Sequence, residues 1–151
     1  MKIHYYLSDY ISHRRAGEAY IACLRDMGHT LVGAPGGSDL IIIHDGPHFY
    51  PEIVRAMPRR PGTKVVGYAV WETPQLSPLF MEGVRLVDAV WTCSDFSLRA
   101  FAPHVETRLL PHVVERPKVS RGDMAWAVKR LGMTGARREG RDLFYFYTVV
   151  D

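Results

Sequence analysis

Cysteine is scarce in this chain, with two among 151 residues, and this excludes a fold that depends on a disulfide framework. Cys23 and Cys93 each lie within an apolar stretch, so buried reduced thiols are the simplest interpretation, and they suit a reducing cytoplasm. No window approaches the roughly 18 apolar residues of a membrane span. The N-terminal residues lack the apolar region and cleavage site of a signal peptide. We therefore expect a cytoplasmic protein.

The sequence also lacks the motifs of several enzyme classes. It has no GxGxxG fingerprint, which argues against NAD or FAD, and no P-loop, GxSxG or CxxC motif, so nucleotide kinases, hydrolases and zinc modules gain no support. The segment HDGPH at 44–48 places two histidines beside a carboxylate, but its spacing matches no strong metal-ligand pattern. We expect neither a metal nor a tightly bound cofactor.

What is present is an ordinary globular composition, with 47% hydrophobic and 23% charged residues. The net charge of +3 is unevenly placed, because basic residues concentrate in the segment 116–141. A solvated basic helix is the default interpretation of this segment. An anionic membrane surface and a phosphate-bearing ligand are the alternatives, whereas nucleic acid is not expected because aromatic residues do not alternate with the charges.

Strand patterns alternate with helix patterns along the first two-thirds of the chain. Apolar strand-like runs are found at 2–8, 30–35, 39–45, 64–72, 88–94 and 107–112. Helical spacing or helix-start signals are found at 16–29, 51–57, 77–87 and 95–104. This alternation predicts an α/β fold, namely a Rossmann-like, doubly wound, mostly parallel sheet with helices on both faces.

The change of composition along the chain predicts its organisation. We expect a Rossmann-like domain at 1–117, a basic helical linker at 118–141, and at 142–151 the opening strand of a second domain. The last segment, DLFYFYTVVD, is aromatic and β-branched and no helix pattern follows it. An unpaired strand is a template for association, so it would add to its own sheet or pair with a second copy of the chain.

Polar residues at the carboxyl ends of these strands are the candidate site residues, because ligands of open α/β sheets bind there. Arg14, Arg15 and Gly17 follow the first strand and precede a helix, so we predict a phosphate site formed with the helix amides. His44 and Asp45 end the strand at 39–45, and we predict that they line a cleft.

Two further strand ends carry polar residues. Glu72, between Trp71 and Thr73, follows the apolar strand at 64–72; it is either a cleft carboxylate or a residue that caps a helix or pairs with a surface arginine. Ser94 and Asp95 end the strand at 88–94 and are placed to cap the next helix, whose amides can also face a ligand.

The segments YAVWETP, VDAVWTCSDFSLRAF and LLPHVVERP together resemble the group 1 retaining glycosyltransferases of GT-B fold. The resemblance covers about 64–117 in motif and 1–117 in topology. It implies a two-domain enzyme that moves a sugar from a nucleotide diphosphate to a sugar or glycoconjugate acceptor with retention of configuration. The family's N-terminal domain mainly receives the acceptor, and its C-terminal domain, which binds the donor, has no counterpart here.

By this resemblance, Glu72 lies nearest the reacting sugar, although many relatives have a histidine there. The same cleft would hold Trp71, Thr73, Ser94 and Asp95, with His44 and Asp45, and the segment Arg14 to Gly17 would meet the donor phosphate. Such a half-enzyme would be inactive alone and cytoplasmic, with the inner membrane face as an alternative site. A noncatalytic Rossmann-like or flavodoxin-like binding module that acts as a partner subunit is the alternative function.

Overall fold

The computed structural model describes residues 1–114, 120–130, 137–138 and 141–142. The chain divides into two units, Met1–Val114 and Glu115–Asp151, with a boundary close to the one expected after residue 117. The first unit contains every candidate site residue. We describe each unit by itself.

The first unit is built on a six-stranded sheet in which every strand pair is parallel. Its strands are β1 (Lys2–Leu7), β2 (Thr30–Leu31), β3 (Leu40–His44), β4 (Lys64–Tyr68), β5 (Ala89–Thr92) and β6 (Thr107–Leu109). Their order across the sheet is β2-β1-β3-β4-β5-β6, so the direction of winding reverses between β1 and β3. The predicted Rossmann-like α/β fold is confirmed.

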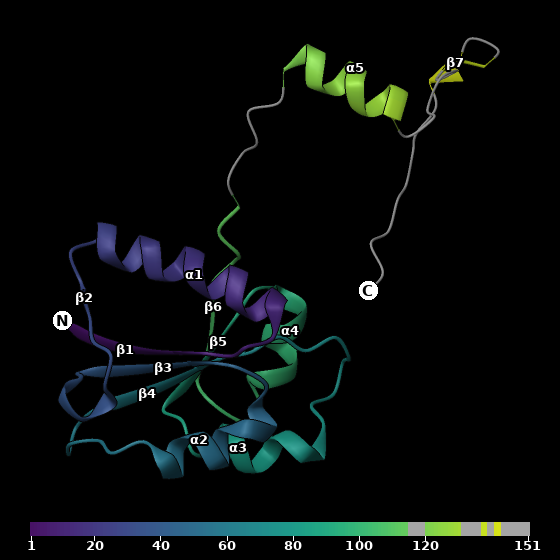
Figure 1. Ribbon diagram of the computed structural model, residues 1–151. Coiled ribbons are helices and arrows are strands. Elements are labelled where there is room, and N and C mark those ends of the chain that lie inside the picture. The colour runs from purple at the N-terminus through teal and green to yellow at the C-terminus, as the bar shows by residue number, and fades with distance from the viewer. Residues whose placement is uncertain (115–119, 131–136, 139–140, 143–151) are drawn as a thin grey trace. The chain divides into compact units, whose positions relative to one another are not determined.

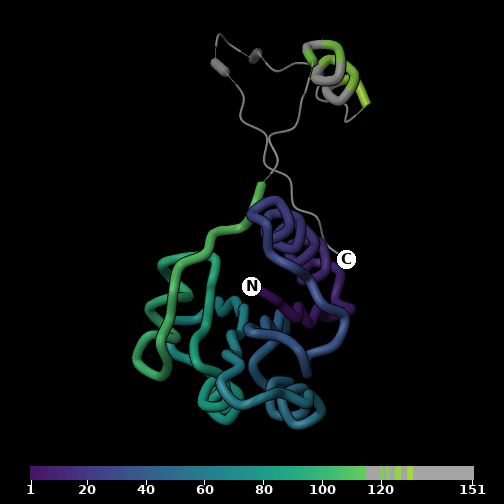
Figure 2. The backbone as a smooth tube through the Cα atoms, turned by 90° about the vertical axis from the view of Figure 1, so that its left-hand side faces the viewer, coloured from purple at the N-terminus to yellow at the C-terminus, as the bar shows by residue number. Residues whose placement is uncertain are grey.

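Helices cover both faces of this sheet. The α-helices are α1 (Ile11–Asp26), α2 (Tyr50–Ala56), α3 (Met81–Arg85) and α4 (Asp95–Phe101), and the 3₁₀ turns are η1 (Pro35–Gly37), η2 (Pro47–Phe49) and η3 (Pro78–Phe80). In Figure 1, α1 lies above the sheet, and α2 and α3 lie below it; Figure 2 shows the same separation from the side. Proline near the start of α2 and of η3 supplies a φ angle already suited to a helix.

The core lies between the sheet and α2, α3 and α4. Ile41, Ile43 and Val65 contribute one face of β3 and β4, and they pack with Tyr50 of α2 and Val84 of α3. All five are nearly inaccessible to solvent. The unbroken apolar run in β3 is explained by this position, because a central parallel strand is buried on both faces.

The connection between β2 and β3 contains only the short turn η1, whereas every later connection within the six-stranded sheet contains an α-helix. The face of β1 opposite α1 therefore has no crossover helix of its own. His4 and Tyr6 of β1 line a cavity on that face. The short η1 connection thus creates the space in which the candidate site lies.

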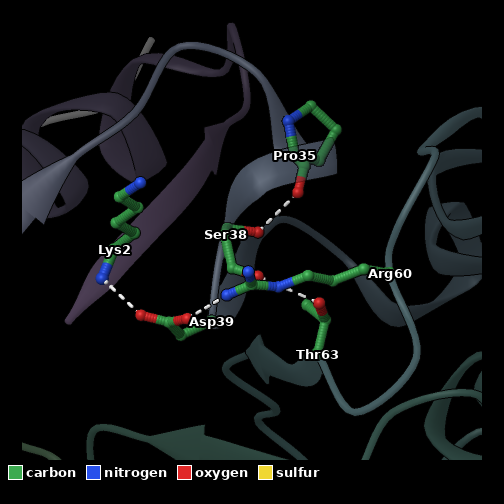
Figure 3. Close-up of polar contacts among 6 residues, drawn as sticks. All are labelled: Lys2, Pro35, Ser38, Asp39, Arg60 and Thr63. Carbon is green, nitrogen blue, oxygen red and sulfur yellow. Dashed lines mark hydrogen bonds and ion pairs between the residues drawn. The ribbon is translucent and has the colours of Figure 1, made fainter.

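A polar cluster at the amino ends of β1, β3 and β4 fixes their alignment (Figure 3). The Asp39 carboxylate accepts a hydrogen bond from the Lys2 amide at 2.8 Å and pairs with Arg60. The Thr63 hydroxyl donates to the Ser38 carbonyl at 2.9 Å, and the Ser38 hydroxyl donates to the Pro35 carbonyl at 2.6 Å. These contacts join the residues that begin three adjacent strands, and so they stabilise the parallel register.

Two of the predicted boundaries that differ from the structure matter for the site. Helix α1 begins at Ile11, earlier than the start predicted at residue 16. Strand β4 ends at Tyr68, so Trp71 and Glu72 lie in the loop that follows it instead of at the strand terminus. The Ala69 amide still donates to the Trp91 carbonyl of β5, but the Trp71 amide donates to the Ser97 hydroxyl of α4, so the segment leaves the sheet between these residues.

In the second unit, α5 (Arg121–Arg130) lies within the predicted basic linker. The linker is not helical to its end, because β7 (Arg137–Arg138) and β8 (Arg141–Asp142) pair antiparallel. Of the strand predicted at 142–151, only Asp142 falls within the described residues, so its pairing with another copy stays a prediction. Among the described helices, none combines the length and apolar character required to span a membrane.

Candidate functional site

The candidate site is a cavity of about 820 Å³ beside the carboxyl ends of β1 and β3, where the strand order reverses. Open α/β sheets bind ligands at this point, because the loops from the two strands diverge there. Strand β1 contributes His4 and Tyr6 to the wall, and the loop before α1 contributes Asp9 and Tyr10. The remaining wall comes from His13, the turn η1, the loop Asp45–Phe49 and the outer face of α2.

His44 is the best-buried polar residue beside this cavity, with 2% of its surface exposed. Its Nδ1 lies 2.9 Å from the Tyr5 hydroxyl, and its ring stacks on His13 at a centroid distance of 5.4 Å. Burial, reinforced by the nearby His13 and His112, lowers the pKa of His44 from 6.5 to about 3. The imidazole is therefore neutral at physiological pH and supports His13 without adding charge.

Two tyrosines extend this cluster towards β6. The Tyr20 and Tyr68 hydroxyls lie 2.7 Å apart, and the Tyr20 hydroxyl donates to the Pro111 carbonyl at 2.9 Å. The Tyr68 ring also contacts His44, with a centroid distance of 4.4 Å. Burial raises the pKa of both tyrosines, so they remain protonated hydrogen-bond donors. The cluster holds α1 and the segment after β6 against the sheet.

Asp45 directly follows β3 and has 8% of its surface exposed. Its Oδ1 accepts a hydrogen bond from the Gly46 amide at 2.7 Å and lies 3.8 Å from Nδ1 of His13. That His13 nitrogen is buried and has no hydrogen-bond partner in the described part of the chain. Asp45 thus places an acceptor at the cavity wall, and the buried His13 nitrogen lies beside it. The carboxylate can bind and orient a hydroxyl or an amine.

Gly17 is buried within α1. A Cβ atom at this position would overlap the Leu7 side chain and approach His44 Nδ1 to 3.0 Å. The absence of a side chain therefore lets α1 pack closely on β1 and β3. The phosphate contact predicted for Gly17 stays a prediction, and the contacts that the structure gives to this residue are packing contacts.

The two arginines of the predicted phosphate site lie in the first turns of α1. Arg14 is exposed and pairs with Asp9, which precedes the helix. Arg15 is exposed as well and has no ion pair within the described residues. A phosphate at this helix N-terminus would compete with Asp9 for Arg14, whereas Arg15 is free to contact it. The phosphate site therefore stays a prediction.

Trp71 and Ser94 meet around Ser97 at the carboxyl ends of β4 and β5, and Asp95 directly follows Ser94. The Ser97 hydroxyl donates to the Trp71 carbonyl at 2.7 Å, and the Ser94 hydroxyl caps α4 by accepting the Ser97 amide at 3.2 Å. Asp95 is exposed in the first turn of α4, where a carboxylate stabilises the helix dipole. The capping role predicted for Ser94 is confirmed, and a ligand contact there stays a prediction.

Glu72 and Thr73 lie in the exposed loop after β4. The Thr73 hydroxyl donates to the Gln75 carbonyl at 2.8 Å, which closes a local turn. The Glu72 carboxylate has no hydrogen bond or ion pair to any described residue, so neither the capping nor the arginine-pairing interpretation is found here. The catalytic role predicted for Glu72 stays a prediction.

The structure therefore separates the predicted residues into two groups. Asp45 and His13 line the cavity and His44 lies behind His13, so His44 itself is not part of the wall, whereas Trp71, Ser94 and Asp95 form the second group. Aromatic rings connect the groups: Trp71 packs edge-on against Phe80 at 4.7 Å, and Phe80 stacks on His48 at 5.5 Å. His48 lines the cavity, so this chain of rings reaches its wall from the second group.

Sequence reasoning missed the residues that surround His44, namely Tyr5, Tyr20 and Tyr68. Tyr5 and Tyr6 are neighbours in β1 and therefore point to opposite faces of the sheet, Tyr5 towards His44 and Tyr6 into the cavity. The polar aromatic run HYY within an otherwise apolar strand is a signal that could have identified Tyr5, but not Tyr20 or Tyr68.

No group of three or more histidine, cysteine, aspartate or glutamate side chains is arranged to hold a metal ion in the described ranges. The site is therefore described by its hydrogen-bonding and aromatic groups alone. Scans of the chain against protein-family models, curated proteins and solved structures found no match.

Proposed function

We propose that the Met1–Val114 unit is the acceptor-side half of a nucleotide-sugar-dependent glycosyltransferase. The observation that carries this proposal is the cavity of about 820 Å³ at the point where the strand order of a Rossmann-like sheet reverses. Its wall combines aromatic rings with carboxylate and imidazole groups, a combination suited to the apolar faces and the hydroxyls of a sugar. The sequence resemblance to GT-B enzymes points in the same direction.

In this proposal, the residues of the cavity bind the acceptor. Asp45 and His13 would orient an acceptor hydroxyl, with the neutral His44 ring stacked behind His13. Glu72 would lie nearer the transferred sugar, and Arg15 nearer the donor phosphate. The donor-binding half would be a separate domain, and transfer would require both halves, because proximity of donor and acceptor supplies much of the rate acceleration.

Saccharide binding by the whole chain tests the proposal. We expect sugars to shift the ¹H–¹⁵N NMR signals of Tyr6, Asp45 and His48, because these residues line the cavity. Ala56→Trp, in the cavity wall, should abolish the shifts, whereas Ala102→Trp, on an exposed site at the end of α4, should leave them unchanged. Shifts that are absent with every sugar, or that are insensitive to Ala56→Trp, would contradict the proposal.

Nucleotide-sugar turnover supplies the second test. Incubated with labelled UDP-sugars or GDP-sugars and a panel of saccharides, the chain should neither transfer nor hydrolyse them. Robust turnover would show that one chain contains both halves of the active site, and the assignment of an acceptor-side half would then be wrong. Tight nucleotide binding by a chain that binds no sugar would favour a noncatalytic nucleotide-binding module.

A further inference from the structure

The charge of the cavity wall has a consequence for the ligand. Three carboxylates, those of Asp9, Asp45 and Glu52, line the cavity, and no lysine or arginine is among the lining residues. Asp9 is already paired with Arg14 and Asp45 faces the His13 ring at 3.8 Å, whereas Glu52 has no ion pair among the described residues. An anionic ligand would meet like charge in this cavity, and a cationic ligand would meet opposite charge.

Asp45 offers a ligand in the cavity an open hydrogen-bond acceptor. The residue is 8% exposed, its Oδ1 accepts from the Gly46 amide, and its Oδ2 has no hydrogen-bond partner among the described residues. This oxygen is accessible rather than buried, so it is free to accept a hydrogen bond from water or from a ligand. Because Asp45 lines the cavity, a ligand in the cavity can supply the missing donor.

Aromatic rings complete the environment that a cation prefers. Tyr6, Tyr10 and Phe49 line the same cavity, and the faces of such rings attract ammonium groups. Burial, together with the negative charges of Asp45, Asp9 and Glu52, raises the pKa of Tyr6. The negative charges of all three carboxylates therefore affect the same residue of the cavity wall, Tyr6.

We propose that this cavity binds a ligand bearing a protonated amine, and that the acceptor is accordingly an amino sugar whose ammonium group is held by Asp45. The identification of the ligand as a sugar rests on the proposed function, whereas its positive charge rests on the lining residues. The ammonium group donates to Oδ2 of Asp45 and lies over the neighbouring rings. Glu52, on the exposed face of α2, adds to the attraction from the other side of the cavity.

Calorimetric titration of the whole chain with three sugars of the same ring tests the proposal, namely glucosamine, glucose and glucuronate. We expect glucosamine to bind at least about tenfold more tightly than glucose, and glucuronate most weakly, which is a difference of about 1.4 kcal/mol or more. The preference should shrink when salt is raised from about 0.1 M to about 1 M, because screening weakens attraction between partly exposed charges. Equal affinities for glucosamine and glucose would overturn the proposal.

Variants show which carboxylate causes the preference for glucosamine. Asp45→Asn should reduce the preference for glucosamine to less than about threefold, a loss of at least about 0.7 kcal/mol. Asp39→Asn, at the opposite edge of the sheet, should leave it unchanged. Glu52→Gln, at an exposed position, should weaken the preference less and serves where Asp45→Asn alters the far-ultraviolet circular dichroism. A preference that survives both Asp45→Asn and Glu52→Gln would overturn the assignment.

A non-sugar amine separates this inference from the proposed function. If cyclohexylamine binds in an Asp45-dependent manner while no sugar binds, the cationic site is supported and the glycosyltransferase proposal fails. If sugars bind regardless of their charge, the proposed function stands and the cationic site is wrong. If no amine binds, the cationic site is wrong as well.

Discussion

Carboxylates at the amino ends of the parallel strands differ in their partners from carboxylates at the carboxyl ends. We call these two sides of the sheet the amino edge and the carboxyl edge. At the amino edge, Asp39 and Asp88 each have a cation and a backbone amide as partners: Arg60 with the Lys2 amide, and Lys64 with the Val65 amide. At the carboxyl edge, the cavity carboxylates of Asp45 and Glu52 and the nearby Glu72 have no lysine or arginine partner in the part of the chain that the structure describes. Asp9, paired with Arg14, is the exception at that edge.

This difference indicates that the polar residues at the amino edge have a structural role, whereas those at the carboxyl edge are available for binding. The amino-edge carboxylates stabilise the strand register, because their partners are the residues that begin adjacent strands. The carboxyl-edge groups make few such contacts, and His44 is buried in a neutral state. Carboxylates that lack structural partners, such as Glu52, are typical of binding sites, where stability is lost in exchange for function.

The largest effect is expected where the carboxyl-edge loop packs against α3. A Cβ atom at Gly83 would overlap the backbone carbonyl of Pro47, so Gly83→Ala must displace the loop that carries Asp45 and His48. We expect a loss of about 3 kcal/mol in the free energy of unfolding, measured by urea denaturation. Gly37→Ala, in the amino-edge turn, has no atom within 4 Å of the new Cβ and should change stability by less than about 0.5 kcal/mol.

An equal cost for the two alanine variants would show that α3 and the loop adjust to the added methyl group. The carboxyl edge would then be a deformable site, and the distances around Asp45 would lose their value as a guide to the ligand. A large cost at Gly83 alone would establish that this edge is rigidly held, as a preformed binding site requires.

The second prediction concerns the pH at which each edge loses its contribution to the free energy of unfolding. His44 has its pKa lowered from 6.5 to about 3, so the unfolded chain binds a proton there in a range where the folded chain does not. Its contribution to stability is therefore present above about pH 6.5 and is lost as the pH falls, by about 3 kcal/mol at about pH 4.5. Asp39 and Asp88 have their pKa lowered below 3.8, by the Lys2 amide and by Lys64 respectively, so they lose their contributions only in more acidic solution.

Urea denaturation at several pH values, for the parent chain and for His44→Asn, measures this difference. The variant should show a flatter dependence of unfolding free energy on pH between about 6.5 and about 4.5. Identical slopes in the two proteins would show that His44 is hydrated and titrates normally. The carboxyl edge would then resemble the amino edge in its exposure to solvent.

The third prediction compares one carboxylate from each edge. In Asp88, Oδ1 accepts from Lys64 and Oδ2 from the Val65 amide, both at 2.8 Å, so Asp88→Asn should cost about 1 kcal/mol. Asp45→Asn should change stability by less than about 0.5 kcal/mol, because an asparagine oxygen can still accept the Gly46 amide and a buried charge is removed. Both values come from urea midpoints at neutral pH. A larger cost at Asp45 would assign it a structural role.

Local sequence patterns predicted the sheet better than they predicted the site. The apolar runs of β3 and β4 identify buried parallel strands, and proline marks the turns around them. The start of α1 was missed because the residue before it, Tyr10, makes no side-chain capping bond, so the segment has no helix-start signal. The tyrosine cluster could not be predicted locally, because its hydrogen bonds join residues 39 and 48 positions apart.

The smallest effect is expected at Glu72, the residue that the sequence placed nearest the chemistry. Its side chain is exposed and has no hydrogen-bond or ion-pair partner among the described residues, so Glu72→Gln should change the unfolding free energy by less than about 0.5 kcal/mol. Thr73→Val, which removes the hydrogen bond to Gln75, should cost more and serves as the matched variant in the same loop. A cost of about 1 kcal/mol at Glu72 would reveal a structural partner, as in the capping or arginine-pairing interpretation. An unchanged stability would leave Glu72, like Asp45, as a carboxylate that the fold does not need.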